Sequence, residues 1–288
     1  MFRTFADMFK NKDIRNRIFF TLAMLFVFRF GSAITVPGVD VTELIKGMQD
    51  SSLFAMINML GGGGLEQLSI FAMGVGPYIT ASIIIQLLSM DVIPALTELA
   101  KGGATGKKQI DRYTRYLAVV LSFFQASTLV YSFSTQYKTL LVNGSGWASI
   151  LYVATLLTAG SMFILWIGDR ISMKGIGNGV SMIIAAGIIS RLPYQFTTAW
   201  QTLVDPSNSS ATFNGILTFG LYIVSYLLII VFVVFMQTAE RKIPIQYTSS
   251  TVTTRKKDMT YLPLKINSAS VIPVIFASAI MVAPLQIC

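Results

Sequence analysis

The feature that most constrains this chain is an uncharged run of 22 residues, from Ser69 to Met90. About 20 apolar residues suffice for one helical crossing of a bilayer. This run also carries glycine, proline and polar residues, namely Gly74, Gly76, Pro77, Tyr78, Thr80, Ser82 and Gln86. Such residues are tolerated at membrane depth where protein or water lies beside them. The run therefore predicts a membrane span that borders a channel.

Composition places the whole chain among integral membrane proteins. Hydrophobic residues make up 53% of the sequence, charged residues only 12%, and the mean hydropathy is +0.65. Apolar runs long enough to cross a bilayer predict an all-α bundle with about seven spans. These spans lie near 18–36, 69–90, 116–133, 147–168, 180–198, 213–236 and 266–287.

The basic residues predict the orientation of the bundle. Most of the 22 Lys and Arg residues fall in the tail 1–17 and in the loops 91–115, 169–179 and 237–265. Cytoplasmic segments of membrane proteins carry such an excess. The amino terminus is therefore expected on the cytoplasmic side, with the tail as an amphipathic helix on the membrane surface. The same pattern accounts for most of the net charge of +9 without nucleic acid as a partner.

The longest inner loop, 237–265, exceeds this general pattern. It contains two basic groups, Arg241 with Lys242 and Arg255 to Lys257. A mobile basic strand of this kind suits an acidic or RNA-rich partner. A solvated cytoplasmic loop is the simpler interpretation.

An apolar segment on the outer side, 52–68, is too short to span the membrane. Four consecutive glycines, Gly61 to Gly64, follow its first part and favour a hinge, because they lack side chains that could pack. A short helix over 53–60 that folds back into a cavity and a loop resting on the lipid headgroups are equally compatible with these residues.

No residues for enzymatic chemistry are evident. Histidine is absent and the one cysteine is Cys288, so neither a Cys/His metal cluster nor a histidine base can form within this chain. The glycine- and lysine-rich stretch 101–108 departs from a phosphate-binding loop and is interpreted as a flexible inner loop. Gly175 to Gly179 lacks the spacing of a dinucleotide fingerprint and predicts a tight turn. We expect no catalytic, cofactor-binding or metal site.

A secondary transporter is the main competing class, since proline- and glycine-broken spans are typical of carriers. Pro77 and Pro273 do interrupt predicted spans. Coupling to protons or cations usually places Asp or Glu at membrane depth. All 13 acidic residues lie outside the centres of the predicted spans, which argues against ion coupling but leaves a passive solute carrier open.

Several stretches together resemble the SecY family, the central subunit of the bacterial protein-translocation channel. The run from Ser69 to Leu88 is similar to the second span of that family. Further similar stretches, close to the Gram-positive form, are 27–31, 36–39, 175–179, 241–247, 262–267 and 271–276. The resemblance extends through essentially the whole chain.

The resemblance implies a ten-span channel of two pseudo-symmetric halves, of which this chain covers about seven spans. Its amino-terminal half would be 18–198 and its partial carboxy-terminal half 199–288. The stop near the seventh span suggests a truncated form of the channel subunit. A truncated chain that is itself a client of membrane insertion, without channel activity, is the alternative.

The resemblance also implies a ring of aliphatic side chains around a narrow pore. By position, the ring consists of Val75, Ile79, Val180, Ile184 and Ile275. Val75 and Ile79 form one pair, and Val180 and Ile184 form another. In each pair the i, i+4 spacing places both residues on one helical face. Branched aliphatic side chains at a narrow neck disfavour a continuous water column. Ordinary helix packing has the same spacing and is the alternative interpretation.

Further family features fall on the segments already singled out. The plug, a stopper below the ring, would be about 52–67 and would include Leu53, Phe54, Met56, Ile57, Met59 and Leu60. The lateral gate, through which apolar segments leave for the lipid, would involve Thr80, Gln86 and Gln125. The docking surface for the ribosome and the SecA ATPase would involve Arg241, Lys242, Arg255, Lys256 and Lys257.

The expected function is conduction without bond chemistry. Unfolded secretory chains would cross the bacterial plasma membrane, and transmembrane segments of nascent chains would be released into the lipid. The expected partners are SecE-type and SecG-type small subunits, the SecA ATPase and the ribosome. An insertase or chaperone would be the partner if the chain is a client.

Overall fold

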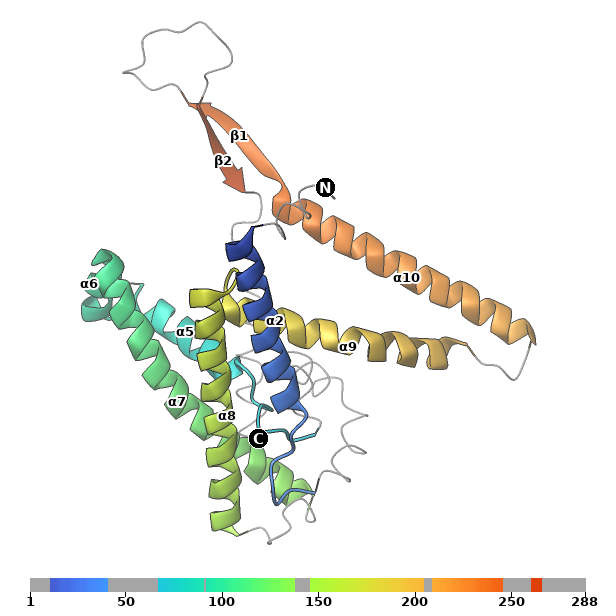
Figure 1. Cartoon of the computed structure of the whole chain (residues 1–288), viewed down its shortest axis with the longest axis horizontal. Coiled ribbons are helices and arrows are strands. Elements are labelled where there is room, and N and C mark those ends of the chain that lie inside the picture. Colours follow the sequence, from blue (N-terminus) through green and yellow to red (C-terminus); the bar gives the residue numbers. More distant parts are fainter. Residues whose placement is uncertain are drawn as a thin grey trace, which may run out of the picture. The chain divides into compact units, whose positions relative to one another are not determined.

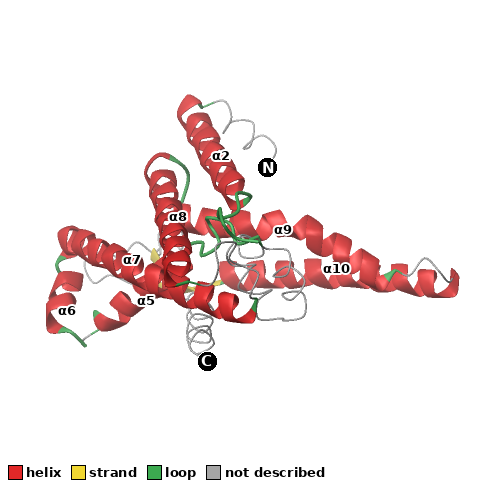
Figure 2. Cartoon of the chain, turned by 90° about the horizontal axis from the view of Figure 1, so that it is seen from below, coloured by secondary structure: helices red, strands yellow, loops and turns green. Residues whose placement is uncertain are grey.

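A computed structural model of the chain describes residues 11–40, 67–90, 92–137, 146–204, 209–245 and 260–265. Their architecture is almost entirely helical, as predicted (Figures 1 and 2). The helices are α2 (Lys12–Ser32), α5 (Gly76–Leu88), α6 (Pro94–Lys101), α7 (Gly103–Gln136), α8 (Trp147–Lys174), α9 (Gly179–Leu203) and α10 (Ser209–Thr238). One pair of strands, β1 (Glu240–Ile245) and β2 (Thr260–Lys265), completes the described elements.

Three of the described helices are long and apolar enough to cross a membrane: Thr105–Thr135 within α7, Trp147–Lys174 and Thr212–Thr238 within α10. They coincide with three of the predicted spans. Each helix extends beyond its predicted span into polar sequence, and the first helix likewise begins at Lys12 instead of 18. Lysine, arginine and glutamine are good helix formers, so a helix continues past the point where its sequence stops being apolar. The last predicted span, 266–287, lies outside the described residues.

The second predicted span, 69–90, is helical over only part of its length. Residues 67–75 form turns, and the helix α5 covers only the 13 residues Gly76–Leu88. At 1.5 Å per residue, such a helix is about 20 Å long, against about 30 Å for the hydrocarbon core. Pro77 stands in its first turn, where proline stabilises a helix start. Glycine and proline thus mark where the helix begins.

The prediction of a flexible loop over 101–108 is wrong. α6 ends at Lys101 and α7 begins two residues later at Gly103, whose φ of +67° is in the left-handed region that favours glycine. A Cβ atom on Gly106 would overlap with the backbone carbonyl of Leu99. These glycines therefore allow α6 to fold back against the start of α7.

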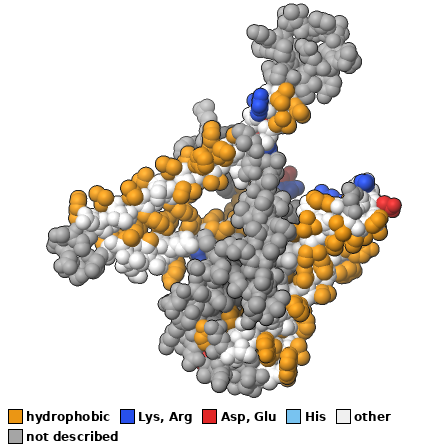
Figure 3. All heavy atoms as spheres, turned by 180° about the vertical axis from the view of Figure 1, so that it is seen from behind, with side chains coloured by type: hydrophobic (Ala, Val, Ile, Leu, Met, Phe, Trp, Pro, Cys, Tyr) orange, Lys and Arg blue, Asp and Glu red, His pale blue; other side chains and the backbone are white. Residues whose placement is uncertain are grey.

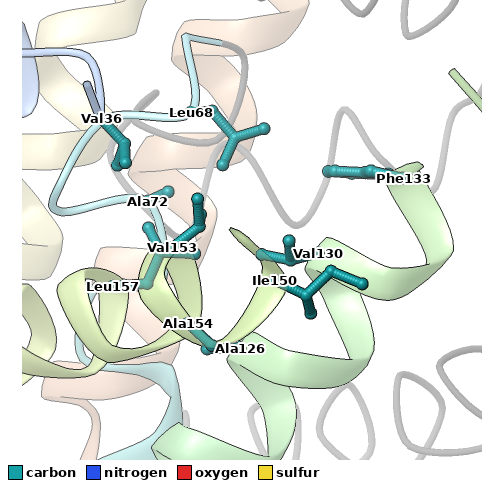
Figure 4. Close-up of a cluster of buried hydrophobic side chains, with 10 residues drawn as sticks. All are labelled: Val36, Leu68, Ala72, Ala126, Val130, Phe133, Ile150, Val153, Ala154 and Leu157. Atoms are coloured by element: carbon teal, nitrogen blue, oxygen red, sulfur yellow. The ribbon is translucent and has the colours of Figure 1, made fainter. Parts of the chain in front are cut away.

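The largest core lies between α7, α8 and the segment before α5. It comprises Val36, Leu68, Ala72, Ala126, Val130, Phe133, Ile150, Val153, Ala154 and Leu157 (Figure 4). A second link between α7 and α8 is polar, because the buried hydroxyls of Ser122 and Ser161 lie 2.9 Å apart. Near one end of these helices, Arg115 and Asp169 form an ion pair of 3.0 Å. α7 and α8 thus form the framework against which α5 is placed.

Leu157 to alanine is expected to cost about 2 kcal/mol or more of unfolding free energy. The Leu157 side chain is fully buried, so its removal leaves a cavity. Leu151 on the same helix is 46% exposed, and its replacement by alanine should cost little, because lipid solvates an exposed leucine as well as a protein neighbour does. Reversible unfolding in detergent measures both variants. Equal costs for the two would contradict the assigned packing.

The described residues up to Pro193 form one compact unit and those from Tyr194 form a second. In the second unit, the end of α9 packs on the start of α10 through edge-to-face aromatic pairs. Trp200 and Phe219 are the closest of these, with ring centroids 5.0 Å apart. None of the apolar window of α10 is buried within the chain. Figure 3 shows hydrophobic side chains covering much of the helix surfaces on one face. Such a surface suits a lipid environment.

The strands β1 and β2 pair antiparallel, with Glu240 opposite Lys265 and Ile245 opposite Thr260. This hairpin was not predicted, since the sequence of 237–265 indicates a loop. Proline at 244 and 263 weakens a strand prediction, because proline donates no ladder hydrogen bond. In this register Pro263 lies opposite Lys242, and Pro244 lies opposite Tyr261, two pairs further along. Pairs with and without mutual hydrogen bonds alternate in an antiparallel ladder, so both prolines can occupy positions that need no amide donor to the partner strand.

Candidate functional site

The segment 67–75 is held in a non-helical conformation by the chain that follows α2. Thr35 and Ser69 form an antiparallel bridge. On either side of it, the Val36 amide donates to the Leu68 carbonyl and the Ile70 amide to the Ile34 carbonyl, both at 3.1 Å. Phe71 then stacks on Phe28 of α2 and Phe163 of α8, with ring centroids 6.3 and 5.9 Å away. The segment is thereby fixed between two helices.

Two of the predicted ring residues stand at the junction between this segment and α5. Val75 is the N-cap residue of α5 and is only 4% exposed. Its carbonyl accepts a hydrogen bond of 3.1 Å from the Ile79 amide. The i, i+4 relation predicted from the sequence therefore holds, and both side chains lie on one face of the helix start.

The other described ring residues, Val180 and Ile184, stand at the start of α9. The tight turn predicted over Gly175 to Gly179 is confirmed, since it joins α8 to α9 and includes Gly177 with a φ of +68°. The Asn178 side chain accepts hydrogen bonds from the amides of Val180 (3.0 Å) and Ser181 (3.3 Å). Asn178 thus caps α9 and fixes where its first ring residue stands.

The structure brings these four ring residues into one hydrophobic cluster. Its buried members come from α2, the 67–75 segment, α8 and α9: Phe28, Phe71, Val75, Ile164, Ile167, Ile171 and Ile183. Ile79, Val180 and Ile184 pack against it as partly buried side chains. Val75 is thus buried within the cluster, and the other three lie at its margin. That the four line a pore stays a prediction.

Ser172 of α8 is a site residue that sequence analysis missed. Its hydroxyl donates to the Gly168 carbonyl at 3.0 Å and accepts from the Gly179 amide at 2.8 Å. It therefore ties the end of α8 to the start of α9. The pattern that points to such a role is a serine one turn before a glycine-rich turn, but it becomes informative only once the two helix ends are known to meet.

The residues predicted for the lateral gate lie on two helices. Thr80 and Gln86 are on α5 and Gln125 is on α7, the helix that packs beside α5. Thr80 is half-buried, and its hydroxyl donates to the Gly76 carbonyl at 3.2 Å. Gln86 is exposed and Gln125 half-buried. The span that would face them in a gate, the seventh, lies outside the described residues.

Of the predicted docking residues, Arg241 and Lys242 are exposed on β1. Successive residues of a strand point to opposite faces, so the two cations project on the two sides of the ribbon. The other three, Arg255, Lys256 and Lys257, lie outside the described residues, as do Ile275 of the ring and the plug residues Leu53 to Leu60. Among the residues that the structure describes, no group of three or more acidic or cysteine side chains could hold a metal ion.

The chain matches a known protein family over most of its length. A family model described as SecY matches residues 69–288. The protein translocase subunit SecY of Bacillus subtilis is 44% identical over 286 residues, which are 99% of this chain and 66% of that protein. The same subunit of Staphylococcus carnosus is 43% identical over 285 residues, with the same coverage of both chains. The chain thus spans about two thirds of the length of these relatives.

Solved structures agree in fold. A structure described as that of a protein-conducting channel matches 94% of this chain and 57% of its own, with a TM-score of 0.62 and 18% identity. Sec61 in a canine ribosome-channel complex from the endoplasmic reticulum matches 94% of this chain and 58% of its own, with a TM-score of 0.61 and 19% identity. With its all-α fold, its non-helical segment before α5 and a family match over three quarters of its length, this chain belongs to the SecY family.

Proposed function

We propose that this chain is the central subunit of a channel that conducts unfolded polypeptides across a membrane and releases apolar segments into the lipid. The observation that carries the proposal is the hydrophobic cluster around Val75. It joins two helix starts, those of α5 and α9, to one framework helix, α8. A partly buried aliphatic margin at helix starts suits a constriction that excludes water yet deforms around a passing chain.

The proposed setting is the bacterial plasma membrane, with the amino terminus in the cytoplasm. The excess of Lys and Arg in the segments assigned to the inside supports this orientation. The energy for transport would come from the ribosome or from the SecA ATPase, and SecE-type and SecG-type subunits would complete the channel. Family membership supports the SecA ATPase and the two small subunits, and the matched ribosome-channel complex supports the ribosome. The matched proteins favour neither a solute carrier nor an insertion client.

Site-specific crosslinking tests the proposal. Cysteine is introduced at Ile79 or Ile184, and a translocating polypeptide is arrested in membranes that contain the subunit at the full length of its reading frame. Both positions are expected to crosslink to the arrested chain, because their side chains are only partly buried at the margin of the cluster.

The matched control is Leu227→Cys on α10, a position that is 56% exposed but assigned to the lipid. It should give no crosslink to the arrested polypeptide. Crosslinks from Leu227 that equal those from Ile79 and Ile184 would contradict a defined pathway, and no crosslink from either ring position would overturn the proposed function.

A further inference from the structure

We propose that Gly160 and Gly168 of α8 are positioning residues that set the aperture of the ring formed by Val75, Ile79, Val180 and Ile184. This inference rests on the proposed function, because the aperture matters only if the ring is a constriction. α8 itself carries no ring residue. Its proposed role is to fix the distance between the starts of α5 and α9, which carry the ring residues.

The first contact is between Gly160 and the segment before α5. A Cβ atom on Gly160 would overlap with the carbonyl oxygen of Ile70, and it would lie 2.8 Å from both the carbonyl carbon and the Cγ2 atom of that residue. The Ile70 backbone is itself fixed by its hydrogen bond to Ile34. Ile70 is five residues before Val75. How closely the Ile70 backbone approaches Gly160 therefore determines the position of Val75 at the start of α5.

The second contact is between Gly168 and the start of α9. A Cβ atom on Gly168 would lie 3.3 Å from Val180 Cγ2 and 3.5 Å from Ile183 Cδ1. On the other side of this contact, Gly179 approaches the Gly168 backbone so closely that a Cβ atom on Gly179 would overlap with the Gly168 carbonyl. Small residues at such contacts let helix backbones approach without an intervening side chain.

The two contacts lie on one face of α8. Gly160, Ile164 and Gly168 are spaced by four residues each, which brings them to the same side of the helix. Gly160 and Gly168 are roughly 12 Å apart along the axis at 1.5 Å per residue. Ile164 between them is fully buried in the cluster that contains Val75. A single rigid element therefore contacts both ring-bearing starts, each at a point where it has no side chain.

The predicted effect of adding a methyl group is graded. At Gly168 the neighbour must yield by a few tenths of an ångström, whereas at Gly160 a backbone carbonyl must move. At Gly220 on α10 an added Cβ atom would meet nothing within 4 Å. Alanine at these three positions thus forms a series that runs from no displacement at Gly220, through a small one at Gly168, to a large one at Gly160.

A series of thiol crosslinkers of increasing length, called the thiol ruler, measures the distance across the ring directly. Ile79→Cys and Ile184→Cys, at the partly buried margin of the cluster, are combined in a Cys288→Ser background of the subunit at the full length of its reading frame, in proteoliposomes. Bifunctional thiol reagents of increasing length are then applied. The measured quantity is the crosslinker length that gives the highest yield. We expect this length to be unchanged in G220A, longer in G168A and longest in G160A. In vesicles of the corresponding variants without the cysteine pair, resting ion permeability should rise in the same order.

A merely structural role is distinguished by I150A, which removes a buried side chain of α8 about 15 Å along the helix axis from Gly160. It should lower the unfolding temperature without moving the ruler. If G160A fails to accumulate, G168A still decides the matter. An unchanged best crosslinker length in folded G168A, or an equal shift in I150A, would overturn the inference. The ruler does not depend on transport, so failure of the polypeptide crosslinks from Ile79 and Ile184 would instead count against the proposed function.

Discussion

Replacing Gly179 by alanine is expected to remove most of the folded subunit from the membrane. The added Cβ atom would overlap with the Gly168 carbonyl and would lie 2.9 Å from the Gly168 Cα atom. Both obstacles are backbone atoms, so no side chain can rotate away. Forced overpacking of this kind costs about 1–3 kcal/mol or more. Displacement of α9 also weakens the hydrogen bond from the Gly179 amide to Ser172, which contributes about 1 kcal/mol.

Whether G179A stabilises or destabilises the protein distinguishes the tertiary contact with α8 from the intrinsic helix preference of alanine. Gly179 begins a helix, and in helices alanine is favoured over glycine by about 1 kcal/mol. Local preference alone therefore predicts a more stable G179A protein. The amount of subunit in membranes and its unfolding temperature in detergent measure the outcome, with G220A as the control for a helical glycine in open space. A G179A protein as stable as G220A would refute the close approach of α8 and α9.

Reversing the charge of Arg241 and Lys242 to glutamate is expected to weaken ribosome binding about tenfold or more at low salt. Each cation that neutralises a phosphate releases counterions, and binding falls with salt in proportion to the number of such contacts. Loss of two contacts should therefore also flatten the dependence of affinity on salt. The hairpin presents both side chains to solvent on a short ribbon, which suits contact with a phosphate backbone.

The measurement is the Kd of purified ribosomes for proteoliposomes of the subunit at several salt concentrations. The matched control reverses Lys12 and Arg15, two exposed cations at the start of α2, and so makes the same change in net charge away from the hairpin. Equal weakening by both pairs would indicate general charge attraction. An unchanged Kd in the hairpin variant would remove Arg241 and Lys242 from the docking surface.

The amino-acid sequence was sufficient for the class of protein and for the positions of its most apolar helices. Membrane spans are specified locally, because each needs a run of apolar residues and its own backbone hydrogen bonds. The spans over 116–133, 147–168 and 213–236 were therefore found within α7, α8 and α10. The helix ends were not predicted, because hydropathy indicates only which residues lie in the lipid. Polar residues that favour helix extend α7 to Gly103 at its start and α8 to Lys174 at its end.

What only the tertiary structure decided depends on contacts between residues that are distant in sequence. Residues 69–75 read as part of a span, yet the Ile70 amide pairs with Ile34, and its carbonyl lies against Gly160, which together hold the segment out of the helix. The hairpin likewise depends on pairing across 14 intervening residues, from Ile245 to Thr260. The ring pairs Val75 with Ile79 and Val180 with Ile184 follow from helical spacing. Their gathering in one cluster depends on α8. Its glycines share one helical face, but hydropathy does not mark them, and they acquire a role only from the residues that lie against them.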